Sequence, residues 1–289
     1  MRGDWGPFLL LVGVSLLARG RMPAWLFMWT IALAVFWGAK WLTWRRASRG
    51  RMPAAAVSVE YLFGWVGMDA DVFLSGARPR RTPAPREWAA ATLKTLAGAV
   101  LLVAAGRLSR DHASLAVGWL GMLGLILLLH FGLFHLLALE WRRRRVDVQP
   151  LMNGPLGAAS LVDFWGRRWN AAFNELARDI VFLPLARRCG AKVAALGVFL
   201  ASGLVHDLVI SVPAGGGYGL PTAYFLLQGI ATLFERSAVG RSVGLGRGWR
   251  GHVFTLVVTA GPVFWLFHPP FARNVILPML RFLSSALGF

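Results

Sequence analysis

The chain has 289 residues, of which 56% are hydrophobic, and its mean hydropathy is +0.56. The formal net charge is +18, but the basic residues fall between apolar runs and not along one soluble face, which argues against nucleic acid as a partner. Continuous apolar runs of about 20 residues predict membrane-spanning helices, and their lack of alternation disfavours a β-barrel. Cys189 is the only cysteine, which excludes an intrachain disulfide and a thiolate metal cluster.

The apolar runs predict an all-α, polytopic integral membrane protein with about eight transmembrane helices plus interfacial or re-entrant helices. The predicted spans are residues 5–18, 24–44, 88–106, 113–139, 191–212, 218–235, 252–268 and 271–289. Residues 54–75 contain Glu60, Asp69 and Asp71, which fits an interfacial or re-entrant segment better than a full span. No repeat of fixed period and no low-complexity linker is apparent, so residues 1–289 are predicted to form a single membrane domain.

The arginines predict the orientation of these spans. Four connections each contain four arginines, at residues 45–51, 78–86, 142–145 and 236–250. The alternate connections contain one or two, at residues 19–21, 107–110 and 273. Because cytoplasmic loops of membrane proteins are enriched in Lys and Arg, we expect the arginine-rich connections and both termini to face the cytoplasm.

Two polar insertions interrupt the apolar sequence between Ser160 and Ser211. The first is S-L-V-D-F-W-G-R-R-W-N at residues 160–170. Asp163, Arg167, Asn170, Asn174 and Arg178 follow one another at spacings of four, three, four and four residues. This spacing predicts that they line one face of a single helix from about residue 160 to residue 182, which Pro184 ends.

The second insertion, F-L-A-S-G-L-V-H-D-L-V-I-S at residues 199–211, places His206 and Asp207 inside a run that is otherwise hydrophobic enough to span a bilayer. An Asp or Lys at the centre of a membrane helix costs about 2.5 to 3.5 kcal/mol on insertion scales. Ionisable residues in such a run are therefore candidates for function, although His206 could also serve only to hydrogen-bond a neighbouring span.

Both insertions resemble the plant-type wax synthase branch of the membrane-bound O-acyltransferase (MBOAT) superfamily. The motifs that carry the resemblance are D-F-W-G-R-R-W-N at 163–170, S-G-L-V-H-D at 202–207 and a looser L-F-H-P-P-F at 266–271. The resemblance extends over roughly residues 150–272. It implies an MBOAT-like fold and an acyltransferase with an intramembrane histidine and an upstream asparagine, which correspond to His206 and Asn170. Family members often carry Glu after the histidine, where this chain has Asp207.

The chemistry of ester formation from a thioester agrees with this correspondence. A neutral His206 can take the hydroxyl proton as a general base, and the Asn170 amide can donate to the thioester oxygen or orient the histidine. Ser202 and Gly203 precede His206 by four and three residues, so we expect a small helix surface that admits the substrate hydroxyl. The supporting residues predicted around this pair are Asp207, Trp169 and Asp163.

Arg167 and Arg168 are candidates to bind the phosphates of acyl-CoA on the cytoplasmic side. They could instead anchor lipid headgroups, or form ion pairs with Asp163 and Glu175. No metal and no cofactor are predicted, because acyl-CoA is the cosubstrate.

The predicted function is therefore acyl transfer from acyl-CoA to a lipophilic alcohol in a multi-pass membrane protein, with wax ester synthesis as the leading reaction. The acceptor stays open among long-chain alcohols, diacylglycerol, sterols and hydroxylated secondary metabolites, because apolar pockets discriminate weakly. A transporter or scaffold whose polar residues line a passage is the alternative, although the repeat symmetry common in transporters is not apparent. The predicted partners are acyl-CoA, the alcohol and membrane lipid, and the sequence leaves the oligomeric state undetermined.

Overall fold

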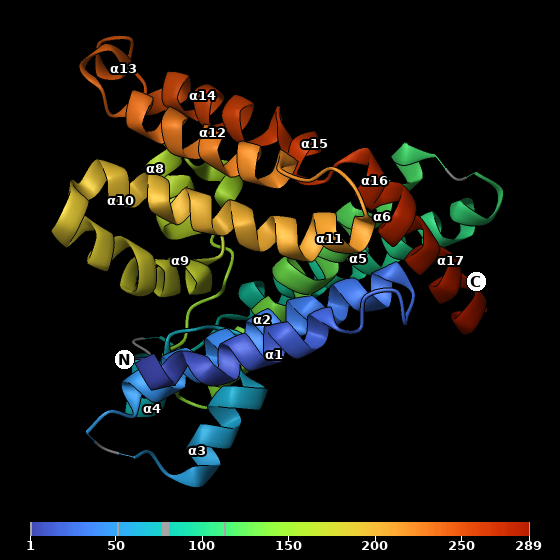
Figure 1. Cartoon of the computed structure of the whole chain (residues 1–289), viewed down its shortest axis with the longest axis horizontal. Helices are drawn as coiled ribbons and strands as arrows, with labels where there is room; N and C mark the ends of the chain where they lie inside the picture. Colours follow the sequence, from blue (N-terminus) through green and yellow to red (C-terminus); the bar gives the residue numbers. More distant parts are fainter. Residues whose placement is uncertain (1, 51, 77–80, 113, 289) are drawn as a thin grey trace. The chain divides into compact units, whose positions relative to one another are not determined.

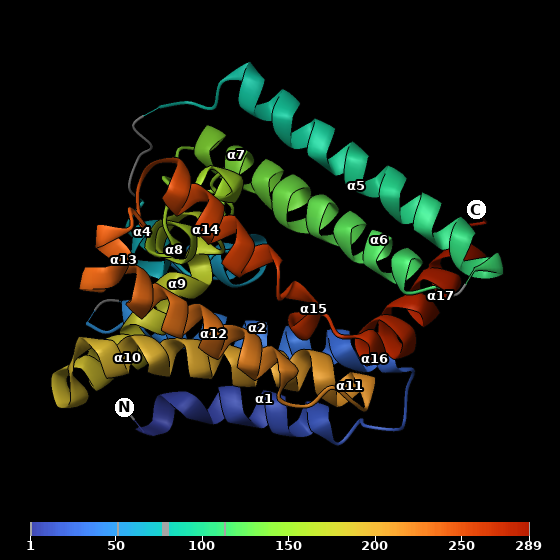
Figure 2. The same cartoon turned by 90° about the horizontal axis from the view of Figure 1, so that it is seen from above.

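The computed structural model of the chain describes residues 2–50, 52–76, 81–112 and 114–288. Several residues of the predicted basic loops, namely Arg51, Arg78, Pro79 and Arg80, lie outside these ranges. The described residues form helices and connecting turns, and no strand occurs among them, as an all-α fold requires (Figures 1 and 2). The chain divides into two compact units, which are residues 1–151 with 273–289, and residues 152–272.

The first unit contains most of the long apolar helices. Its helices are α1 (Gly6–Leu16), α2 (Ala24–Ala47), α3 (Ala55–Val59), α4 (Ala70–Ser75), α5 (Pro85–Asp111), α6 (Leu115–Leu125), α7 (Phe134–Arg143) and α17 (Leu277–Leu287). A π-helical stretch, Ile126–Leu133, joins α6 to α7, so these three segments form one continuous rod beside α5 (Figure 2). The rod approaches α5 closely at Gly98, where an added Cβ would lie 2.3 Å from the backbone nitrogen of Leu128.

The segment between α2 and α5 is held to α2 by a buried lysine. Lys40 is fully buried, and its Nζ donates to the carbonyl oxygen of Gly67 at 2.8 Å. The same Nζ lies 3.2 Å from the centre of the Tyr61 ring. The indole Nε1 of Trp65 donates to Asp69 at 2.6 Å, and burial raises the pKa of the Asp69 carboxyl. Gly67 and Tyr61 therefore hold this segment against α2 through Lys40, whereas Glu60 and Asp71 are exposed.

The second unit contains both polar insertions. Its helices are α8 (Leu161–Asp163), α9 (Ala171–Ala177), α10 (Leu183–His206), α11 (Val212–Ala214), α12 (Leu220–Glu235), α13 (Ala238–Ser242), α14 (Gly248–Ala260), α15 (Val263–Leu266) and α16 (Pro269–Phe271). π-Helical turns follow α8, α9, α10 and α16, at Phe164–Arg168, Arg178–Phe182, Asp207–Ser211 and Ala272–Ile276.

The chain reverses direction within α10, which the sequence did not predict. Gly190 has φ 81° and ψ 164°, a conformation that glycine tolerates and other residues rarely adopt. The part of α10 after Gly190 runs back beside α9 (Figure 1), and an added Cβ at Gly197 would lie 2.5 Å from the side chain of Leu185. The prediction that Pro184 ends the preceding helix is wrong, because the backbone stays helical from Ala171 through the π turn Arg178–Phe182 and past Pro184, and the break comes at Gly190.

Four helical stretches among the described residues are long and apolar enough to cross a membrane, namely Ala24–Ala47, Pro85–Asp111, Leu115–Arg143 and Ala171–Ala214. Gly248–Leu266 and Pro269–Leu287 together make a fifth if they are counted as one span. The all-α membrane fold is confirmed, but the predicted number of eight spans is not. Whether residues 1–289 act as a single membrane domain stays a prediction.

Candidate active site

The first polar insertion does not form the single helix predicted for residues 160–182. Trp169 is extended, with φ −104° and ψ 119°, and Asn170 is left-handed, with φ 46° and ψ 63°. Asparagine enters the left-handed region more readily than most residues, because its short side chain can bond the nearby backbone. Here the Asn170 Oδ1 accepts a hydrogen bond from the backbone nitrogen of Phe173 at 3.3 Å and caps α9. The prediction that five polar residues share one helical face is therefore wrong.

The capping role leaves one end of the Asn170 amide available. The amide atom that faces the Phe173 N–H must be the acceptor Oδ1, so the other amide atom is the donor Nδ2. Nδ2 donates to no other group within the ranges that the structure describes. Asn174 takes a different role, since its Nδ2 donates to the carbonyl oxygen of Trp165 and ties α9 to the preceding π turn. Of the two asparagines, only Asn170 has an Nδ2 group that makes no hydrogen bond to another described residue.

The two candidate arginines of this segment differ. The Arg168 guanidinium donates through Nε to Asp163 and through another nitrogen to the Gly154 carbonyl oxygen at 3.1 Å. The ion pair between Arg168 and Asp163 lies within the segment, whereas the hydrogen bond to Gly154 ties the segment to the residues before it. The ion-pair alternative that the sequence left open is therefore observed for Arg168. The Arg167 side chain is exposed and makes no hydrogen bond or ion pair to another described residue. Arg167 is thus the arginine that is free for a ligand.

Aromatic rings connect the first insertion to the histidine of the second. Trp165 packs edge-on against Trp169 and lies 5.6 Å from Phe225 of α12, measured between ring centres. The Phe225 ring lies 4.5 Å from the His206 ring. The Trp165 Nε1 donates to the side chain of Gln228 at 3.3 Å, which fixes the orientation of the indole. Sequence reasoning missed Phe225 and Gln228, because nothing in an apolar helix such as 218–235 marks which side chains face another segment.

The backbone sets the tautomer of His206. Its Nδ1 lies 2.7 Å from the carbonyl oxygen of Ser202, one helical turn earlier. A carbonyl oxygen can only accept, so Nδ1 carries the proton and Nε2 keeps its lone pair. The imidazole is partly buried, and its Nε2 has no hydrogen-bond partner among the described residues. This arrangement gives the proton-accepting nitrogen that a general base needs.

The small residues before His206 serve a purpose other than the one predicted. An added Cβ at Gly203 would lie 2.6 Å from the Cα of Thr222, so Gly203 admits the backbone of α12. The Ser202 side chain is buried and donates to the carbonyl oxygen of Val198 at 2.9 Å. The small surface beside His206 is therefore occupied by a neighbouring helix, and the expectation that it admits a substrate hydroxyl is wrong at Gly203.

Asp207 caps the beginning of α12. One carboxylate oxygen accepts from the backbone nitrogen of Gly219 and from the Ser211 hydroxyl, each at 2.8 Å. The other accepts from the backbone nitrogen of Thr222 at 3.1 Å and from the Thr222 hydroxyl. Four donors on one carboxylate hold the turn before α12 in place, and α12 in turn carries Phe225 against His206. Asp207 thus supports the histidine through the fold.

A second histidine completes this network. His268 is fully buried, and its Nδ1 accepts from the backbone nitrogen of Phe271 at 3.2 Å. Its Nε2 must therefore carry the proton, and it donates to the hydroxyl of Ser211 at 3.1 Å. The Ser211 hydroxyl then donates to Asp207. The motif at 266–271 was the one sequence signal for His268, whereas nothing in the sequence marked Ser211.

The structure brings His206, Asp207, Trp165 and Trp169 together through these contacts. It does not join Asn170 to His206 by a hydrogen bond within the residues it describes. Among the residues that the structure describes, no group of three or more His, Cys, Asp and Glu side chains is placed to hold a metal ion. The arrangement provides one proton acceptor at His206 and one amide donor at Asn170, both within the unit formed by residues 152–272.

Comparison with known proteins agrees with the predicted resemblance. Residues 148–227 match the family described as "Membrane bound O-acyl transferase family". The chain is 37% identical over 151 residues to "Probable long-chain-alcohol O-fatty-acyltransferase 3" of Arabidopsis thaliana, a match that covers 45% of this chain and 42% of that protein. It is 33% identical over 159 residues to "Acyl-CoA--sterol O-acyltransferase 1" of Arabidopsis thaliana, covering 50% of this chain and 44% of that protein.

A third relative is "Long-chain-alcohol O-fatty-acyltransferase" of Simmondsia chinensis, which is 32% identical over 144 residues, covering 45% of this chain and 40% of that protein. In each case the match spans less than half of the relative's length. These matches confirm that the chain resembles the plant wax synthase branch of the membrane-bound O-acyltransferases, with the family signature at residues 148–227.

Proposed function

We propose that the chain transfers a fatty acyl group from acyl-CoA to the hydroxyl of a long-chain alcohol and so forms a wax ester. The observation that carries the proposal is the tautomer of His206, whose Nε2 is an unpaired proton acceptor beside the aromatic cluster of the D-F-W-G-R-R-W-N segment. The names of the relatives, which include long-chain-alcohol and sterol acyltransferases, support a lipophilic alcohol as the acceptor.

In the proposed reaction, His206 Nε2 takes the proton of the alcohol as its oxygen attacks the thioester carbonyl. The carbonyl oxygen becomes an oxyanion, which the free Nδ2 of Asn170 stabilises by donating a hydrogen bond. Collapse of the tetrahedral intermediate breaks the bond between carbon and sulfur. The departing thiolate of coenzyme A takes the proton from Nε2, so the ester, the free thiol and a neutral His206 remain. Desolvation of the site limits the competing attack by water.

The experiment that tests the function uses purified full-length protein and labelled acyl-CoA with a panel of acceptors. The panel contains a long-chain alcohol, a sterol, a diacylglycerol and water alone. We expect ester formation with the long-chain alcohol in preference to the others. Ester formation with the sterol alone would support acyl transfer but show that the acceptor is a sterol and not a long-chain alcohol. The absence of product with every acceptor would contradict acyl transfer.

We propose further that the arginine-rich connections face the cytoplasm, where acyl-CoA is available. The arginine distribution supports this orientation. Single cysteines at Val146 and Tyr218, in a protein whose Cys189 is replaced by serine, are expected to react with a membrane-impermeant reagent from opposite sides of sealed vesicles. Reaction of both cysteines from the same side would contradict the orientation.

A further inference from the structure

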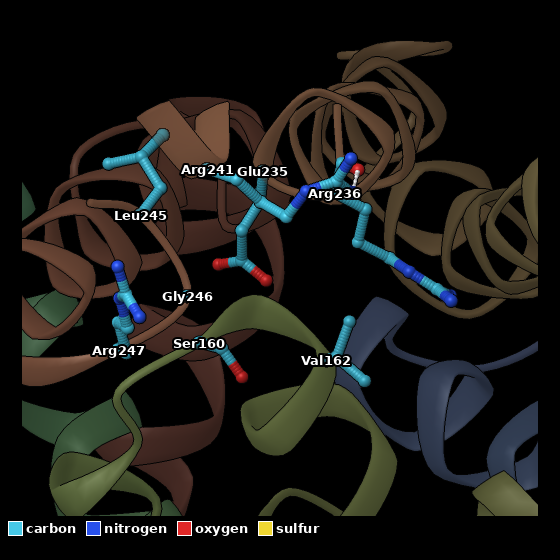
Figure 3. Close-up of a pocket in the computed structure, with 8 residues that line it drawn as sticks. All are labelled: Ser160, Val162, Glu235, Arg236, Arg241, Leu245, Gly246 and Arg247. Atoms are coloured by element: carbon cyan, nitrogen blue, oxygen red, sulfur yellow. Dashed lines mark hydrogen bonds between the residues drawn. The ribbon is translucent and has the colours of Figure 1, made fainter. Parts of the chain in front are cut away.

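Three arginines line a cavity at the far end of α12. The cavity has a volume of about 440 Å³, and its walls come from the start of the first polar insertion, the end of α12 and the loop before α14 (Figure 3). Its charged lining residues are Arg236, Arg241, Arg247 and Glu235. The proposed transfer chemistry at His206 and Asn170 uses none of these four residues.

The carboxylate in this cavity offsets only part of the positive charge of the three arginines, and Arg236 is the arginine with which it interacts electrostatically. Glu235 is buried, and its Oε2 accepts a hydrogen bond from the backbone nitrogen of Leu161 at 2.8 Å, where α8 begins. No ion pair joins Glu235 to an arginine among the described residues. Figure 3 shows the Glu235 carboxylate pointing toward the segment at Ser160, while Arg236 and Arg247 extend to either side of it. The carboxylate therefore anchors the first polar insertion and leaves the cavity positively charged.

Two of the three guanidinium groups are free. The Arg241 side chain donates to the backbone carbonyl oxygen of Arg236 and so stabilises the turn after α12. Arg236 and Arg247 are exposed and make no side-chain hydrogen bond or ion pair with other described residues. Arg247 is also the residue that precedes α14, so the positive end of that helix adds to the field of the cavity. Planar guanidinium groups are suited to phosphate oxygens, which they bind through two parallel hydrogen bonds.

The place of the cavity along α12 indicates what kind of phosphate compound fits. Glu235 lies ten residues after Phe225, the ring that contacts His206, which corresponds to a rise of about 15 Å along the helix. A ligand with its phosphates in the cavity and its reactive end at His206 must span this length. In acyl-CoA, an extended pantetheine arm separates the phosphates from the thioester. Figure 3 shows Arg236 and Arg247 on either side of the Glu235 carboxylate, so a ligand that engages both must carry phosphate groups at two separate places, as coenzyme A does.

We propose that this cavity is a phosphate-binding site that takes the nucleotide end of acyl-CoA through Arg236 and Arg247. The phosphate site stands on the cavity and its charges, whereas its assignment to acyl-CoA rests on the function proposed above. An anionic lipid headgroup supplies the same phosphate chemistry, so the test distinguishes the two sources.

The test compares two double variants that each lower the net charge by two. One variant carries Arg236→Gln and Arg247→Gln in the cavity. The control carries Arg187→Gln and Arg188→Gln, two arginines of α10 that are also exposed and lie outside the cavity. Free coenzyme A is titrated into each full-length protein in uncharged detergent by calorimetry. Retention of phosphatidic acid from nanodiscs is measured in parallel by native mass spectrometry.

We expect the cavity variant to bind coenzyme A at least about tenfold more weakly than the wild type, the loss that follows when charge-assisted contacts to phosphate are removed. The control variant is expected to bind like the wild type. A fall in retained phosphatidic acid with unchanged coenzyme A binding would keep the phosphate site and overturn its assignment to acyl-CoA. Unchanged binding of both probes would overturn the site itself. Wild-type protein that binds coenzyme A through the cavity but forms no ester would contradict only the proposed transferase reaction.

Discussion

Replacing Asp207 by alanine tests whether this residue acts through the fold. The substitution removes the acceptor of four hydrogen bonds, which come from Ser211, Gly219 and both the backbone nitrogen and the hydroxyl of Thr222. Hydrogen bonds to a charged group contribute about 1.5 to 3 kcal/mol each, and loss of a helix cap costs about 0.5 to 2 kcal/mol. Water can replace the carboxylate at the exposed Gly219, so the individual values do not add.

From these contacts we expect Asp207→Ala to lower the free energy of unfolding by about 3 kcal/mol. For a chain of this size, that loss corresponds to a melting temperature lower by about 6 to 12 °C. The assay is thermal unfolding of purified protein in detergent, followed by tryptophan fluorescence, because Trp165 and Trp169 lie in the affected unit. Turnover is expected to fall as well, since α12 holds Phe225 against His206.

Thr222→Val is the matched control, because it removes one of the four donors while keeping the shape of the side chain. We expect it to cost about 1 kcal/mol, the usual contribution of one hydrogen bond. A melting temperature of Asp207→Ala within about 2 °C of the wild type would refute the capping role, since that shift corresponds to less than about 1 kcal/mol. A loss of turnover without any loss of stability would instead assign Asp207 a direct part in the chemistry.

Asn170→Gly and Asn170→Ala are both expected to lower turnover by about 10²- to 10³-fold, the loss typical of one oxyanion donor. Because glycine keeps the left-handed backbone, normal turnover in Asn170→Gly would show that the residue matters only for the conformation of the chain. Arg167→Gln is expected to raise the KM for acyl-CoA without changing the melting temperature. Arg168→Gln is expected to lower the melting temperature, because it breaks the ion pair with Asp163. Steady-state kinetics and thermal unfolding of each variant check both results. The wild-type rate is expected to fall as the pH drops through the pKa of the His206 imidazole, because only neutral Nε2 accepts a proton. If the pH–rate profile of His206→Ala shows the same fall at low pH, His206 is not the general base.

Local composition was enough to predict the long helices of the first unit. The predicted spans 24–44, 88–106 and 113–139 each lie within, or begin two residues before, the observed stretches Ala24–Ala47, Pro85–Asp111 and Leu115–Arg143. A run of apolar residues long enough for a bilayer determines its own helical state, because every backbone polar group must be bonded within the segment. The number of spans was harder to predict, since an apolar helix can equally turn back or pack in a protein interior.

The breaks within the helices escaped prediction for a different reason. Helical periodicity carries no sign of a left-handed residue, so Asn170 was read as one more position on a polar face. Gly190 reverses the chain through its backbone angles alone, and glycine inside an apolar run is a weak signal. The reversal at Gly190 brings Gly197 against Leu185, a contact between two parts of α10 that helical periodicity does not indicate.

Site residues that belong to a sequence motif could be predicted, whereas residues that reach the site only through packing of the folded chain could not. His206 stood out because ionisable residues are rare in an apolar run, whereas Asn170 was identified by its place in the D-F-W-G-R-R-W-N motif. The hydrogen-bonded chain from His268 through Ser211 to Asp207 joins residues that lie up to 61 positions apart, so only the folded chain reveals it. The function of Gly203 was misjudged for the same reason, because its neighbour Thr222 comes from another helix.

The most direct test of the central claim compares His206→Ala with a matched histidine variant in the acyl transfer assay. His252 is the control, because its Nδ1 also lies near a backbone carbonyl oxygen, that of Ala158, at 3.0 Å, in the same unit. With labelled acyl-CoA and a long-chain alcohol, His206→Ala is expected to lose about 10²- to 10⁴-fold in turnover while still binding coenzyme A, the range typical of general-base catalysis. His252→Ala is expected to keep turnover close to that of the wild type. A folded His206→Ala protein that forms ester at the wild-type rate would contradict the account.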